Sequence, residues 1–142
     1  MFFEDFKLGT SFELAPVKVD RERIRSFARD YDPLPLHLDE EKAKASRFKG
    51  LIAPGVMSFM LVWAEFVKLG VVNDNLIAGL STKIEWFVPV YIGDELTGKV
   101  TVTGLEGRTE SSGLVELTTE VFNQSSMLVL RDVTELLMDR QL

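Results

Sequence analysis

The chain has 142 residues, 46% of them hydrophobic, with 16 basic and 22 acidic side chains and a formal net charge of −6. This length fits one domain spanning residues 1–142, and the hydrophobic content excludes a disordered chain. The acidic balance argues against a nucleic-acid partner. Because the chain has no cysteine, disulfides and thiolate metal sites are excluded. The opening MFFEDFKLG lacks the basic and apolar regions of a secretory signal, so we expect a cytoplasmic protein.

The first elements are short. Residues 1–10 mix aromatic and acidic side chains and predict an arm that packs against the domain. Residues 11–19 predict a strand, in which Pro16 favours an edge position or a bulge. Asp20 is a suitable N-cap for a short helix over residues 21–29.

The next segment is stiffened by proline. Asp32 precedes Pro33, so the α region is disfavoured there and the helix ends close by. Leu34 precedes Pro35 and is likewise expected to be extended. We therefore predict a rigid loop that presents Asp32 and His37 from constant positions.

Residues 51–69 form the most hydrophobic stretch of the chain. After Gly55 the apolar side chains cover every face of the predicted helix, and such a helix is normally buried. A membrane span would need about 20 apolar residues, whereas Pro54, Glu65 and Lys68 interrupt this stretch. We therefore predict a core helix of a protein that is not inserted in a membrane.

After the long helix, the spacing of hydrophobic residues changes to the two-residue period of strands. Four segments rich in β-branched residues are separated by turn residues at hairpin spacing, which predicts an antiparallel meander: residues 77–91, 95–105, 114–123 and 127–138. With the first strand this makes a curved sheet of about five strands. We expect the apolar face of this sheet to pack against the long helix. The predicted class is α+β.

His37 is the only histidine. A lone histidine is more often structural or exposed than catalytic, but this one lies on a stiff loop with Asp32 five positions earlier. Imidazole can exchange a proton near neutral pH, and a carboxylate can orient it or carry a second proton. Asp32 is equally explained as a turn residue that binds its own backbone. The spacing leaves both interpretations open.

Gly55 adds a third component at the start of the long helix. The first N–H groups of a helix have no partner within it, and glycine lets a ligand approach the backbone. A carbonyl oxygen that gains negative charge would be stabilised there. Taken alone, Pro54-Gly55 is more simply a turn. Together with His37 and Asp32, it outlines a site for adding or removing water beside a carbonyl.

Three segments resemble a known family: FARDYDPLPLHLDEEKA (27–43), FKGLIAPGV (48–56) and IEWFVPVYIGDEL (84–96). They are similar to the MaoC-like (R)-specific enoyl-CoA hydratases and dehydratases of the hot-dog superfamily. The resemblance implies a hot-dog fold, in which a curved antiparallel sheet wraps around one long central helix. It also implies a homodimer joined through sheet edges, with the active sites near the interface.

By this resemblance, Asp32 and His37 match the catalytic pair, and Gly55 matches the glycine whose N–H binds the thioester oxygen. The implied reaction is reversible syn hydration of a trans-2-enoyl-CoA to the (R)-3-hydroxyacyl thioester. CoA or the pantetheine of an acyl-carrier protein would carry the substrate, with no metal or redox cofactor.

The chain departs from the family pattern at Leu34, where a polar amide is usual, and at Pro54, which replaces a usual His or Ser. Leu34, Pro54 and Met57 are candidate substrate-binding residues. Two alternatives follow. One is an acyl-thioester-binding protein that has lost turnover. The other is a thioesterase, for which Glu65 is the only acid within the long helix.

Substrate contacts beyond the predicted catalytic pair are less defined by the sequence. Candidate contacts to the CoA phosphates are Arg47, Lys49 and Lys83, although solvated surface is the simpler explanation for each. Phe59 and Met60 are candidate walls of an acyl tunnel, with core packing as the simpler explanation.

Overall fold

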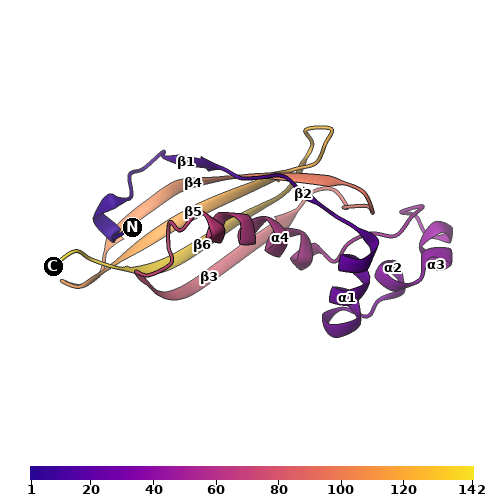
Figure 1. The fold of residues 1–142 in the computed structure, drawn as a ribbon, viewed down its shortest axis with the longest axis horizontal. Coiled ribbons are helices and arrows are strands. Elements are labelled where there is room, and N and C mark those ends of the chain that lie inside the picture. The colour runs from indigo at the N-terminus through magenta and orange to yellow at the C-terminus, as the bar shows by residue number, and fades with distance from the viewer.

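Six strands form an antiparallel sheet in the computed structural model, which describes residues 1–142 (Figure 1). They are β1 (Ser11–Glu13), β2 (Val17–Lys18), β3 (Leu76–Trp86), β4 (Glu95–Gly107), β5 (Ser112–Phe122) and β6 (Leu128–Asp139). The spatial order is β1-β4-β5-β6-β3, and β2 also pairs with β4. The predicted curved antiparallel sheet is confirmed, with six strands rather than about five.

The predicted meander is correct for β4, β5 and β6 but wrong for β3, which lies at the far edge and pairs only with β6. The turn before β4 explains the difference. Gly93 has φ +86° and donates its N–H to the carbonyl of Val19, while the N–H of Val19 donates to the carbonyl of Asp94. The chain is thereby tied beside β2, so β4 begins next to β2 and not next to β3.

The predicted first strand over residues 11–19 is divided in two. β1 ends at Glu13 and β2 begins at Val17, with Pro16 between them. Proline has no N–H for the ladder, which accounts for the break. Both pieces still pair with β4 in the antiparallel sense.

The helices are α1 (Arg21–Tyr31), α2 (Pro35–Leu38), α3 (Glu40–Ala45) and α4 (Gly55–Lys68), preceded by the 3-10 turn η1 (Phe3–Asp5). α4 lies along one face of the sheet, α1 to α3 gather at one end of the molecule, and both termini lie at the other end (Figure 1). None of these helices combines the length and the hydrophobicity needed to cross a membrane. A cytoplasmic location stays a prediction from the sequence.

One side of α4 forms the core with the sheet. Val62 and Phe66 are buried, and a Cβ on Gly98 of β4 would lie only 2.3 Å from Val62, so glycine allows this close approach. The other side of α4 is open: Val56 and Met60 are about half exposed, at 48% and 49%. The prediction that α4 is buried on every side is therefore wrong for the single chain, because the sheet covers only one side.

Candidate active site

His37 lies on the single helical turn α2. Leu34 is extended (φ −82°, ψ 146°), as predicted for a residue before proline, and Pro35 then occupies the first helical position. The predicted stiff loop therefore contains one turn of helix, because proline is suited to a helix start as well as to a loop. This turn directs His37 inward, and the residue is only 6% exposed.

Ile52, in the segment before α4, determines which nitrogen of His37 carries a proton. Nδ1 of His37 lies 2.7 Å from the carbonyl oxygen of Ile52. A carbonyl oxygen only accepts, so Nδ1–H is the donor. The N–H of Ile52 donates in turn to the carbonyl of Leu36. This reciprocal contact leaves Nε2 as the ring nitrogen that can exchange a proton.

Asp32, at the C-cap of α1, supplies the carboxylate. Its Oδ2 lies 3.2 Å from Nε2 of His37, and its side chain is 38% exposed against 7% for the imidazole. Since Nδ1 already carries hydrogen, this direct contact requires one further proton, on Nε2 or on the carboxyl group. The contact thus joins a buried imidazole to a carboxylate that reaches solvent.

Gly55 is the first residue of α4, and its N–H has no hydrogen-bond acceptor in the structure. Trp86, at the end of β3, covers this glycine. A Cβ on Gly55 would lie 2.6 Å from Nε1 of the indole, which is closer than a Cβ atom comes to a neighbouring heavy atom. Glycine is therefore required by the packing of Trp86 as well as by access to the N–H.

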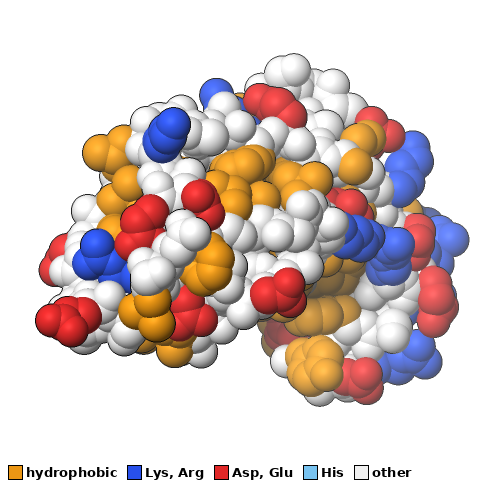
Figure 2. Space-filling model, turned by 60° about the vertical axis from the view of Figure 1, so that its left-hand side comes forward, with side chains coloured by type: hydrophobic (Ala, Val, Ile, Leu, Met, Phe, Trp, Pro, Cys, Tyr) orange, Lys and Arg blue, Asp and Glu red, His pale blue; other side chains and the backbone are white.

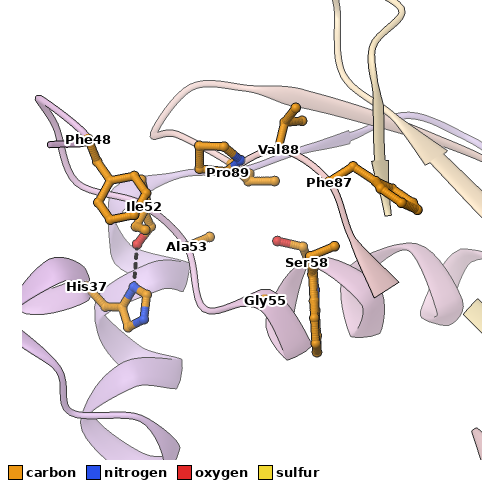
Figure 3. Close-up of a pocket in the computed structure, with 11 residues that line it drawn as sticks. His37, Phe48, Ile52, Ala53, Gly55, Ser58, Phe87, Val88 and Pro89 are labelled. Carbon is orange, nitrogen blue, oxygen red and sulfur yellow. Dashed lines mark hydrogen bonds between the residues drawn. The ribbon is translucent and has the colours of Figure 1, made fainter. Parts of the chain in front are cut away.

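His37, Ile52 and Gly55 line a cavity of about 310 Å³, whereas Asp32 does not line it and contacts His37 from outside. Figure 3 shows His37 and Ile52 on one side of it, Gly55 and Ser58 at the start of α4, and the segment after β3 opposite. The remaining walls are mostly hydrophobic: Phe48, Ala53, Phe87, Val88, Pro89 and Val90. An apolar cavity with an imidazole and a free N–H is suited to proton transfer beside a carbonyl group.

The other predicted site residues lie elsewhere. Leu34 is 50% exposed and Pro54 is the buried N-cap of α4, and neither lines this cavity. Met57 faces the core, at 2% exposure. Phe59 and Met60 line a second cavity further along α4.

The sequence did not single out several residues of the site. Ser58 is 1% exposed and lines the cavity one turn after Gly55, a position that spacing from the helix start would have suggested. Trp86 and Phe48 gave no comparable signal. Tyr91 positions Phe48, because its hydroxyl donates to the carbonyl of that residue at 2.8 Å.

Residues 7–131 match the family described as FAS1-like, dehydratase domain region. The chain is 32% identical over 108 residues to an (R)-specific enoyl-CoA hydratase of Rhodospirillum rubrum, covering 73% of this chain and 71% of that protein. It is 30% identical over 141 residues to the uncharacterized protein YdeM of Bacillus subtilis, covering 99% and 100%. The crystal structure of a MaoC-like dehydratase from Rhodospirillum rubrum matches with a TM-score of 0.90 at 30% identity, covering 100% and 99%.

The family match extends over most of the chain, and the structural match covers all of it. The protein therefore belongs to the FAS1-like dehydratase domain family, among the MaoC-like members of the hot-dog superfamily.

Proposed function

We propose that this protein catalyses the reversible hydration of a trans-2-enoyl thioester to the (R)-3-hydroxyacyl thioester. The observation that carries the proposal is the 3.2 Å contact between Asp32 and His37, because His37 lines a cavity that Gly55 also lines. Hydration of a conjugated thioester needs a base for water, an acid for C2 and a donor for the thioester oxygen. These three groups meet each requirement.

The single mobile proton of the pair defines the sequence of steps. With the proton on Nε2 of His37, the Asp32 carboxylate accepts a proton from water while the water oxygen attacks C3. The proton on Nε2 then passes to C2 from the same side, which makes the addition syn. Asp32 returns its proton to Nε2 across the 3.2 Å contact, so the pair is restored. Dehydration is the same sequence in reverse.

Gly55 stabilises the charge that this sequence creates. As C3 is attacked, negative charge develops on the thioester oxygen, and the free N–H at the start of α4 donates to it. A backbone donor of this kind contributes about 10² to 10³ in rate. No metal or redox cofactor takes part in the scheme. The carrier is CoA or the pantetheine of an acyl-carrier protein, and Arg47 and Lys49 stay exposed candidates for its phosphates.

We further propose that two copies form a homodimer through β3. This strand has an unpaired edge along 11 residues, and its exposed apolar side chains include Ile77 at 47% and Leu80 at 50%. On the face drawn in Figure 2, hydrophobic side chains gather in several separate groups between charged ones. A long apolar edge strand is an aggregation hazard unless it is paired. A second β3 would pair it and would help cover the open side of α4.

The thioesterase alternative is less well supported. Glu65 forms an ion pair with Lys68 at 2.8 Å and does not line the cavity. The non-catalytic alternative rests on Leu34, whose side chain is 50% exposed and does not line the cavity.

The test is to mix the protein with crotonyl-CoA and with longer trans-2-enoyl-CoA substrates and to follow the ultraviolet absorbance of the conjugated thioester. We expect the absorbance to fall without release of free thiol, and the product to have the (R) configuration. Thiol release would identify a thioesterase. Binding without any absorbance change at every chain length would identify a protein that only binds the thioester.

A further inference from the structure

A second cavity, of about 450 Å³, lies along α4, between that helix and strands β3 and β6. Phe59 and Trp63 of α4 form apolar walls, and Leu136 of β6 lies opposite them. The hydroxyl-bearing side chains of Thr82 and Thr134 also line it. Thr82 is exposed and Thr134 is 7% exposed, and with Ser81 they form the polar patch of a mostly apolar lining.

Asp132 lies beneath the two threonines and is completely buried. Its Oδ2 contacts the hydroxyl of Thr134 at 2.5 Å, its Oδ1 contacts the hydroxyl of Thr82, and the two hydroxyls lie 2.8 Å apart. Three hydrogen bonds need three hydrogens, and the hydroxyls supply two. A proton on the carboxyl group completes the ring. Burial raises the pKa of Asp132, which favours this protonated form, although the two hydroxyl contacts oppose the shift.

Thr119 provides a second observation at the same place. It is the direct partner of Asp132 in the pairing of β5 with β6, so the two side chains lie on the same face of the sheet. Thr119 is completely buried, and its hydroxyl has no hydrogen-bond partner. Thr119 does not line the cavity, so it extends the buried polar cluster behind the two threonines and offers no further contact to a ligand.

We infer that Thr82 and Thr134, supported by Asp132, form a subsite for a neutral hydroxyl group on the acyl chain of the substrate. This inference rests on the proposed function and specifies its substrate class. In the closed ring each threonine hydroxyl donates one hydrogen and still has a free lone pair, so the ligand must be a donor. A carboxylate cannot donate. An ammonium group would place an unpaired charge beside a neutral carboxyl group. A hydroxyl group meets the requirement without charge.

The spacing of Trp86 and Thr82 on β3 sets how far along the acyl chain that hydroxyl group lies. Trp86, which covers Gly55, is four residues from Thr82 on the same strand. Four residues of a strand span about 13 Å. For an acyl chain laid along β3 and advancing about 1.1 to 1.2 Å per bond, about eleven bonds would separate the thioester oxygen from the patch. The substrate would be a medium-chain enoyl thioester of about ten carbons with a terminal hydroxyl.

The test compares kcat/KM for trans-2-decenoyl-CoA with that for its 10-hydroxy derivative. Because one matched hydrogen bond is gained, we expect the wild-type protein to favour the hydroxylated substrate by about fivefold or more. Thr82→Val and Thr134→Val, which keep the side-chain shape, should each reduce this ratio to about one, whatever their effect on the rate with decenoyl-CoA. Thr103→Val is the matched control. It removes an exposed hydroxyl that pairs with Thr118 on the opposite face of the sheet, and the preference should stay.

Equal kcat/KM values for the two substrates with the wild-type protein would overturn the subsite, whatever the variants do. If neither substrate is hydrated, the proposed function fails, and calorimetry with the saturated pair, decanoyl-CoA and 10-hydroxydecanoyl-CoA, then tests the subsite alone. Tighter binding of the hydroxylated thioester would support it. Equal affinities would overturn it.

Discussion

At the scale of single residues, the carbonyl oxygen of Ile52 has the largest effect on the chemistry of the site. By accepting from Nδ1 of His37 at 2.7 Å, it leaves only Nε2 for proton exchange, and Nε2 is the nitrogen beside Asp32. The spacing of Asp32 and His37 in the sequence predicted a pair that could meet. A backbone carbonyl 15 residues later carries no side-chain signal, so this partner was not predictable from the sequence.

Gly55 is a second residue whose role is only partly visible in the sequence. Its place at a helix start predicted a free N–H, but the indole of Trp86, 2.6 Å from where a Cβ would lie, is a contact between distant segments. We expect Gly55→Ala to lower kcat/KM by about 10²-fold, because the added carbon displaces the indole and the helix start from their working geometry.

The double variant Gly55→Ala with Trp86→Phe checks this explanation. The smaller ring makes room for the added carbon, so part of the activity should return when kcat/KM is measured for the single and double variants. If the double variant is as impaired as the product of the two single losses, the effect of Gly55→Ala does not come from contact with Trp86.

Asp132 predicts a pH effect on stability. Burial raises the pKa of this carboxyl above its ordinary value of 3.8, so between the two values the folded chain keeps a proton that the unfolded chain has lost. The free energy of unfolding then falls as pH rises through this window, by up to about 1.4 kcal/mol per pH unit. Asp132→Asn keeps the hydrogen bonds of the neutral ring and removes the titration.

Urea unfolding of the wild-type protein and of Asp132→Asn, from pH 4 upward, measures this effect. The two proteins should have similar stability at the lowest pH, and the wild-type protein should become the less stable one as pH rises. Parallel curves over the whole range would mean that Asp132 has the same affinity for its proton in the folded and unfolded chains.

At the scale of elements, α4 and β3 contain most of what sequence patterns could not predict. Hydrophobic residues and Gly55 predicted where α4 begins, and turn residues predicted the ends of β4, β5 and β6 to within two residues. Periodicity does not identify the partner of a strand, however, and β3 was assigned to the wrong neighbour. Nor does periodicity distinguish a helix that is fully buried within one chain from a helix that one chain covers on only one side.

The open edge of β3 predicts the effect of a charge placed there. Ile77 lies on β3 outside both cavities. We expect Ile77→Glu to weaken a dimer at least about tenfold, because it brings like charges to a pairing edge. Sedimentation velocity over a range of concentrations measures this. Thr97→Glu, an exposed position on β4, is the control and should leave the dimer intact. A wild-type protein that sediments as a monomer at all concentrations would contradict the proposed interface.

At the scale of the whole molecule, the two termini and the candidate site lie at opposite ends (Figure 1). The termini are tied together far from the site, where Arg140 forms an ion pair with Glu4 at 2.8 Å. The helices α1 and α2, at the opposite end, bring Asp32 and His37 to the start of α4 (Figure 1). Both cavities adjoin α4 on its way along the sheet.

The most direct test of this account is the initial rate of crotonyl-CoA hydration for the wild-type protein, Asp32→Asn and His37→Gln. Asp30→Asn is the matched control, since Asp30 is an exposed residue of the same helix. We predict that Asp32→Asn and His37→Gln each lower kcat by about 10² to 10⁴ and leave the unfolding temperature unchanged. The double variant should be no slower than the slower of the two single variants. If Asp32→Asn or His37→Gln keeps more than about a tenth of the wild-type rate, the assignment of Asp32 and His37 as the proton-transfer pair is contradicted.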